Sequence, residues 1–149
     1  MKPNGEVNGR LAKVEGFIQR NPTDGARASQ RTDVYLGYVD KNLYVIFVCF
    51  DSEPEKIRAR LARRESIGAD DAVGVILDTF HDQRRAYAFS ANPLGIQADS
   101  LRTEGQGDDL SFDTLWHSRG RLTAQGYVVW MAIPFKSLRF ASAAEQTWG

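Results

Sequence analysis

The stretch TDVYLGYVDKNLYVIFVCF, from Thr32 to Phe50, decides the fold. Its two halves are rich in β-branched and aromatic residues, which favour strands, and Asp40-Lys41-Asn42 between them supplies turn residues. This pattern predicts a β-hairpin. The second half, from Asn42 to Phe50, is apolar on both faces. We therefore expect it to form a central strand that is covered on both sides.

The segments that flank this hairpin also have the composition of short strands. Further strands are predicted over residues 72–80, 84–92 and 95–103, and on either side of Ala124-Gln125-Gly126. The segment EPEKIRARLARRES changes to a helical period, which predicts a short solvated helix or a loop crossing between sheets. Its arginines also suggest an anion-binding patch, although such charge runs are usually solvated. Together these elements predict an all-β protein, an antiparallel β-sandwich that is jelly-roll-like, with one short helical crossover.

The composition describes a globular chain. It has 149 residues, which we assign to a single domain over residues 1–149. Lys plus Arg and Asp plus Glu number 19 each, so no net charge attracts nucleic acid, and none is expected as a partner. The sequence has no apolar run long enough for a membrane-spanning helix and no apolar start typical of a signal peptide. The single cysteine, Cys49, lies in an apolar run and is expected to be a buried, unreactive thiol.

Catalytic constellations do not stand out in the sequence. Aspartates are numerous, but most lie in predicted turns, and no spacing selects a pair for glycoside hydrolysis. His81 and His117 are the two histidines available to a catalytic triad, and the Gly-x-Ser-x-Gly motif of many hydrolases is absent. We therefore predict that this chain is not an enzyme.

Metal-binding residues give a weak signal. The sequence lacks a Cys/His cluster, which disfavours zinc. The acidic segments GADD, residues 68–71, and GQGDDLSFD, residues 105–113, carry oxygen ligands of the kind that calcium prefers. Solvated acidic loops explain the same residues more simply. A structural calcium is therefore an open alternative, and no metal ligand is assigned.

Aromatic side chains suggest a binding function. Sugar rings stack on exposed Trp or Tyr side chains, while polar neighbours bind the hydroxyl groups. Alternation along GYVVWMAIPF places four residues from Tyr127 to Ile133 in the core and Trp130 on the opposite face. Trp130 and Trp116 are therefore candidate stacking platforms, each weighed about evenly against a core position, whereas Trp148 is expected in the core.

Several blocks follow one another in a characteristic order. They are TDVYLGYVDKNLYVIFVCFD, ESIGADDAVGVILDTFHD, RRAYAFSANPLGIQAD and VVWMAIPFKSLRF with the final QTWG. Over roughly residues 9–149 the chain resembles the family 9 carbohydrate-binding modules, in particular those at the N-terminus of large bacterial envelope proteins. The resemblance implies a jelly-roll-like β-sandwich of the DOMON-like group, structural calcium, and association with secreted glycoside hydrolases. The family's clamp of two Trp rings is not assigned here, because Ala72 stands where an aromatic residue is common and Trp130 where Glu is common.

These observations predict a non-catalytic carbohydrate-binding module that directs a secreted or envelope protein to an oligo- or polysaccharide. The predicted ligand-binding residues are Trp130, Trp116, Arg85, Asn92, Asp99 and Arg102. The expected location is extracellular, periplasmic or outer-membrane-associated, and other domains of a larger parent protein are expected partners. The resemblance implies one more strand after Gly149, without which an open sheet edge could pair two copies of the chain. The alternative hypothesis is a structural or assembly domain of an envelope protein without a sugar ligand.

Overall fold

The central hairpin forms as predicted. In the computed structural model, which describes residues 11–149, β2 (Thr32–Val39) pairs antiparallel with β3 (Asn42–Phe50). The turn between them holds Asp40 at a φ of 53°, a left-handed conformation that Asp adopts more readily than most residues. On its other side β3 pairs along its whole length with β9 (Gly126–Pro134). This confirms the central position expected for β3.

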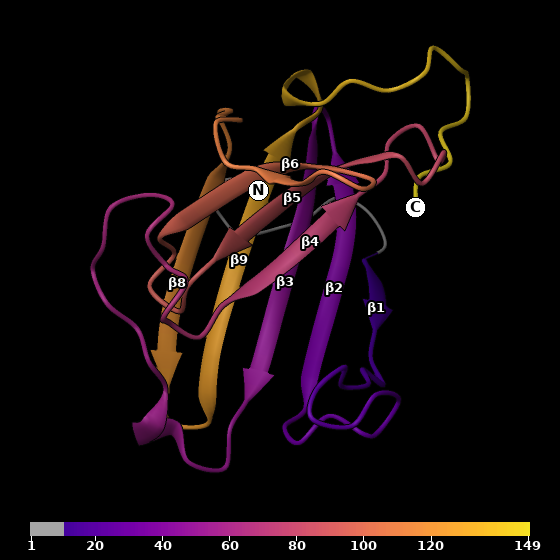
Figure 1. Cartoon of the computed structure of the whole chain (residues 1–149). Helices are drawn as coiled ribbons and strands as arrows, with labels where there is room; N and C mark the ends of the chain where they lie inside the picture. The colour runs from indigo at the N-terminus through magenta and orange to yellow at the C-terminus, as the bar shows by residue number, and fades with distance from the viewer. Residues whose placement is uncertain (1–10) are drawn as a thin grey trace.

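The strands form two antiparallel sheets that pack face to face (Figure 1). The five-stranded sheet has the order β1 (Ala12–Val14), β2, β3, β9 and β8 (His117–Thr123). The four-stranded sheet has the order β4 (Val73–Leu77), β5 (Arg85–Ala91), β6 (Gln97–Thr103) and β7 (Gly107–Asp109). Of these strands, β7 lies in a segment predicted as a loop. The predicted antiparallel β-sandwich is confirmed, and the first ten residues of the predicted domain lie outside the described part of the chain.

The core lies between the two sheets and follows the alternation of side chains along the strands. Val129, Met131 and Ile133 of β9 are fully buried, as their period of two predicts, and Phe89 of β5 meets them from the other sheet. Cys49 is buried in the same core. Burial raises the pKa of the Cys49 thiol, which fits the prediction of an unreactive side chain.

The predicted helical crossover between the sheets is mostly irregular. Only Pro54–Lys56 forms a 3-10 turn, η1, and the rest of the segment is not helical. The backbone N–H groups of Arg58 and Arg60 donate to the carboxylates of Asp71 and Asp70 instead of to carbonyl groups one helical turn earlier. These side-chain acceptors replace the helical ladder. No helix within residues 11–149 is long and apolar enough to cross a membrane.

Two of the arginines in this crossover are bound within the protein. Arg60 Nε lies 2.7 Å from Asp70 Oδ1, and Arg64 pairs with Asp99 and Asp113. Their guanidinium groups are therefore already matched by carboxylates. Half of the arginines in the suggested anion-binding patch are therefore not available to bind an external anion, and we do not assign a site there.

Candidate functional site

Trp130 lies on the outer face of the five-stranded sheet, opposite the core, as the alternation predicts. It stands directly across from Ile46 of β3 and Arg119 of β8. Its ring is half-buried and packs against Tyr44, with the ring centroids 5.9 Å apart and the planes inclined by 37°. Tyr44 is itself buried, so Trp130 is the more exposed ring of this pair, and its role in binding stays a prediction.

Trp116 is a core residue, which corrects its prediction as a stacking platform. Only 2% of its surface is exposed, and its ring packs edge-on against Phe89 at 5.3 Å between centroids. Its Nε1 donates to Asp99 Oδ1 at 3.2 Å. A sugar cannot stack on this ring while the sheets remain packed. Position in the sequence could not show this, because Trp116 precedes β8 and turns inward between the sheets.

Asn92 and Asp99 are also buried, which corrects the prediction that their side chains bind a ligand. Asn92 Nδ2 donates to Arg60 O and to Asp70, while its Oδ1 accepts the N–H groups of Leu94 and Ile96. Asn92 thus holds the crossover against the turn after β5, and its polar atoms are fully used inside the fold.

Asp99 is likewise occupied inside the fold. In addition to the Trp116 ring N–H, its carboxylate accepts the Arg64 guanidinium and the backbone N–H of Thr114. β6 places Asp99 directly across from Phe89, whose ring is in the core, so the same face of the sheet carries both side chains. This register makes Asp99 an anchor for the crossover.

Arg85 and Arg102 are exposed, but they do not form one site with Trp130. Both lie in the four-stranded sheet, where Arg85 is across from Thr103 and Arg102 across from Ala86. The one-position offset points the two arginines to opposite faces of the sheet. Arg102 is also paired with Asp108 at 3.0 Å. The six predicted residues are therefore divided between the core and three separate sheet faces.

A pocket that the sequence did not reveal lies where β2 and β9 end. It has a volume of about 760 Å³, within the range of roughly 300–1,000 Å³ that is usual for ligand pockets. We call it the terminal aromatic pocket, and it is lined by Tyr38, Asp40, Leu43, Phe135, Phe140, Ala144, Glu145, Gln146 and Trp148. Four rings and two carboxylates therefore face one hollow.

The rings of this pocket form a connected cluster. Phe135 lies 6.5 Å from Tyr38 and 6.0 Å from Trp148, and Phe140 lies 5.6 Å from Trp148, measured between ring centroids. Phe135 belongs to the 3-10 turn η2 (Phe135–Ser137), which follows β9. Its N–H donates to Lys41 O at 2.8 Å and ties the turn to the β2–β3 hairpin. Phe135 is thus held both by its continuity with β9 and by its hydrogen bond to the β2–β3 hairpin.

The pocket is also lined by polar side chains. Within residues 11–149 the carboxylates of Asp40 and Glu145 have no ion-pair partner. Gln146 Nε2 donates to Ala141 O and Ala143 O, both at 2.9 Å, which orders the last loop. Free carboxylates beside aromatic rings match the needs of a sugar, whose ring stacks while its hydroxyl groups donate.

Two of the residues that line this pocket show why the sequence did not predict it. Tyr38 has the inward parity of β2, which predicts a core position, but it lies beyond the end of the core and is 72% exposed. Trp148 was expected in the core and does pack against it, yet its ring also lines the pocket. Alternation predicts the face of a sheet on which a side chain lies, and not how far along the strand the opposite sheet extends.

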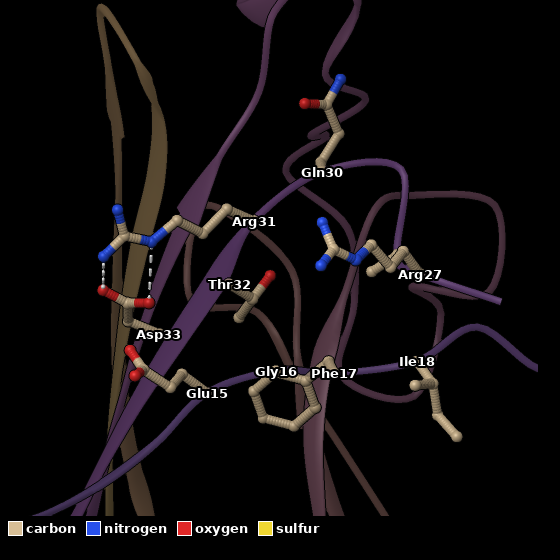
Figure 2. A pocket seen from close by; sticks show the side chains of 10 residues that line it. Glu15, Gly16, Phe17, Ile18, Arg27, Gln30, Arg31, Thr32 and Asp33 are labelled. Atoms are coloured by element: carbon tan, nitrogen blue, oxygen red, sulfur yellow. Dashed lines mark hydrogen bonds and ion pairs between the residues drawn. The ribbon is translucent and has the colours of Figure 1, made fainter. Parts of the chain in front are cut away.

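A second hollow, of about 570 Å³, lies at the other end of β2 (Figure 2). Figure 2 shows the guanidinium of Arg31 against the carboxylate of Asp33 on one side and the side chains of Phe17 and Arg27 on the other. Arg31 Nη2 lies 2.6 Å from Asp33 Oδ2, and this hydrogen bond lowers the pKa of Asp33. Because the Asp33 carboxylate is already paired with Arg31, this hollow is a weaker candidate for a ligand-binding site than the terminal aromatic pocket.

The acidic segments considered for calcium make contacts within the protein. Asp70 binds Arg60 and Asn92, and Asp109 accepts the N–H and the hydroxyl group of Ser111. Among residues 11–149 no three His, Cys, Asp or Glu side chains gather at one point. No metal ligand is assigned on these grounds.

The internal use of carboxylates predicts loss of stability in acid. Backbone N–H groups, first that of Gln83, hold the pKa of Asp78 below its usual value, and hydrogen bonds from Arg60 and Asn92 do the same for Asp70. In the unfolded chain these carboxyl groups have their ordinary pKa, about 4, and so bind protons at a higher pH than in the folded protein. The stabilisation is therefore complete above that pH and is lost as the pH falls through the lower, folded values.

We expect the urea midpoint of unfolding to fall steadily between roughly pH 5 and pH 3. The same titration on Asp70→Asn should show a shallower fall, because one of the depressed carboxyls has been removed. Equal midpoints at pH 3 and pH 7 would contradict this assignment.

Comparison with known proteins agrees with the fold. No family model matches the chain, and no curated protein matches it. A crystal structure of a protein from Bacteroides uniformis ATCC 8492 matches with a TM-score of 0.66 and 11% identity, over 93% of this chain and 68% of that chain. That protein carries the provisional description of a carbohydrate-binding protein. At this identity the likeness shows a shared β-sandwich fold.

Proposed function

We propose that this chain is a non-catalytic carbohydrate-binding module whose ligand, an oligo- or polysaccharide, binds in the terminal aromatic pocket. The observation that carries the proposal is the meeting of four aromatic rings in one pocket with the carboxylates of Asp40 and Glu145, which have no ion-pair partner within residues 11–149. The provisional description of the Bacteroides uniformis protein supports the same class of ligand. The proposal includes the expectations drawn from the family resemblance: an extracellular or envelope location, a larger parent protein and structural calcium.

Binding without catalysis is the simpler use of this pocket. Tyr38 supplies an open ring face, and Asp40 follows it closely at the tight β2–β3 turn. Glu145 and Gln146 approach from the last loop of the chain. Both acids stand among polar and aromatic groups at the surface, where nothing buries a carboxyl group as a general acid would require.

The first test is a glycan-array screen of the folded chain, followed by calorimetric titration of the best ligand. Tyr38→Ala is expected to weaken binding about tenfold, which corresponds to about 1.4 kcal/mol, through loss of the stacking face. Phe80→Ala is the matched control, because Phe80 is 50% exposed and lies outside the pocket. Running the array with calcium and again with chelator tests the calcium expectation.

Unchanged binding by Tyr38→Ala would place the ligand elsewhere. A blank array from a folded sample would favour the alternative, an assembly domain without a sugar ligand. One observation supports that alternative. β4 is an edge strand of the four-stranded sheet: among the strands within residues 11–149 it pairs with β5 alone. Just after β4, Asp78 exchanges two backbone hydrogen bonds of 2.9 Å with Gly149, and β4 itself is left with an open side. A sheet edge of this kind can accept a further strand, and light scattering would then show a mass that rises with concentration.

A further inference from the structure

The outer face of β8 and β9 carries charges that the proposed pocket does not use. Arg119 stands across from Trp130, and Arg121 stands across from Val128. Since Val129 and Met131 point into the core, these four side chains share the outer face of the five-stranded sheet. We call this surface, made by Arg119, Arg121, Val128 and Trp130, the β8–β9 outer face. β8 is the last strand of its sheet, so the surface is open along one side (Figure 1).

The two arginines of this face have no carboxylate partner in the part of the chain that the structure describes. Both are exposed, and within residues 11–149 neither guanidinium makes an ion pair or a hydrogen bond. Elsewhere in the described chain four arginines are matched by acids, namely Arg31, Arg60, Arg64 and Arg102. Asp33, an acid that faces the same side of the sheet, is already bound by Arg31 and Lys13 near its opposite edge. Among the described residues, the β8 side of the face is therefore positive, and no acidic side chain pairs with its arginines.

The spacing of these charges is regular. Residues two apart on one strand lie about 6–7 Å from each other on the same face. His117, two residues before Arg119, continues the row. Each guanidinium offers a planar fork that binds a carboxylate through two parallel hydrogen bonds. Beside this row, the half-buried ring of Trp130 provides an aromatic surface, and Ile46 and Val128 provide an apolar one.

We propose that the β8–β9 outer face binds an acidic polysaccharide, a chain of uronic acids whose carboxylates pair with Arg119 and Arg121 while a sugar ring stacks on Trp130. The low density of charge, two arginines beside an apolar strip, suits a ligand with one carboxylate per sugar better than a densely sulfated chain. The zero net charge of the whole protein gives no long-range attraction for nucleic acid. The choice of a glycan as the carrier of the carboxylates rests on the function proposed above.

The test is calorimetric titration of the full chain with oligogalacturonate. The double variant Arg119→Gln and Arg121→Gln is expected to bind at least tenfold more weakly than the wild type, and wild-type binding should weaken as salt is added. The matched control is Arg58→Gln with Arg63→Gln, which removes two exposed arginines of the crossover and should leave affinity unchanged. Trp130→Phe should bind with intermediate affinity because a smaller ring remains.

Equal affinity of the wild type and the Arg119/Arg121 variant would overturn the proposal, as would equal losses in the variant and in its control. Tighter binding of a heparin oligosaccharide or of single-stranded DNA than of oligogalacturonate would overturn it as well. Tyr38→Ala separates this site from the terminal aromatic pocket, because that variant should keep its affinity for oligogalacturonate. If neutral glycans fail to bind while oligogalacturonate binds through Arg119 and Arg121, the pocket is refuted and the β8–β9 outer face stands.

Discussion

Replacing Trp116 by alanine is expected to lower the free energy of unfolding by about 3–5 kcal/mol. The ring is almost fully buried between the sheets, so its removal leaves a cavity against Phe89. The variant also deprives Asp99 of its ring N–H donor inside the core. A loss of this size is a large fraction of the stability of an ordinary domain, which is about 5–15 kcal/mol.

Urea unfolding followed by circular dichroism measures this effect. Trp116→Phe should cost less than Trp116→Ala, because the smaller ring still fills part of the space between the sheets. Leu115→Ala is the neighbouring control: this side chain is 59% exposed, and its removal should change stability by less than about 0.5 kcal/mol. If Trp116→Ala unfolds at the same urea concentration as the wild type, then Trp116 is not a core residue.

Replacing Asn92 by leucine is expected to cost about 3 kcal/mol, although the side chain keeps a similar size. Asn92 is 0% exposed, and its amide group bridges the crossover and the turn after β5 through Arg60, Leu94 and Ile96. Leucine can neither donate to Arg60 O nor accept the two backbone N–H groups. Those groups would then be buried without partners, which is the costly case for hydrogen bonding.

Two further variants distinguish the hydrogen bonds from simple packing. Asn92→Asp keeps an acceptor for Leu94 and Ile96 but loses the amide donor, and it places a second carboxylate within about 3 Å of Asp70 Oδ2. We expect it to be destabilised at neutral pH and to recover partly as the pH falls. Gln125→Ala removes an exposed amide group as a control. Wild-type stability of Asn92→Leu would contradict the bridging role.

These two results bear directly on any search for the ligand. Loss of binding in Trp116 or Asn92 variants would follow from loss of the fold and would say nothing about contact with a sugar. Tyr38, Arg119 and Arg121 are the informative positions, because their side chains are exposed and make no contact that the core requires.

Much of the architecture follows from local patterns in the sequence. Alternating apolar residues in β9 place Val129, Met131 and Ile133 on one face, and the continuous apolar run of β3 marks a central strand. Asp40 and its neighbours mark the hairpin turn. These features depend on the period of a strand and on turn chemistry, which act between residues close in the chain. The β-sandwich and most of its strands could therefore be predicted.

The candidate site depends on contacts between residues that are far apart in the sequence. Arg64 meets Asp99 across 35 positions, which turns a predicted ligand-binding acid into a buried anchor. Phe135 and Trp148 meet Tyr38 at the end of the sandwich, which creates the terminal aromatic pocket from side chains that the patterns assigned to the core or did not single out. Such long-range contacts depend on the register of strand pairing and on how far along its strands one sheet is covered by the other.

The sequence by itself therefore determined which residues form strands and which face of β9 is buried, because these depend on the alternation of side chains along the backbone. Only the tertiary structure decided that Trp116, Asn92 and Asp99 lie inside while Tyr38 and Arg119 lie outside. The physical reason is that burial of a polar or aromatic side chain depends on the partners that packing brings to it, and those partners come from other strands and loops.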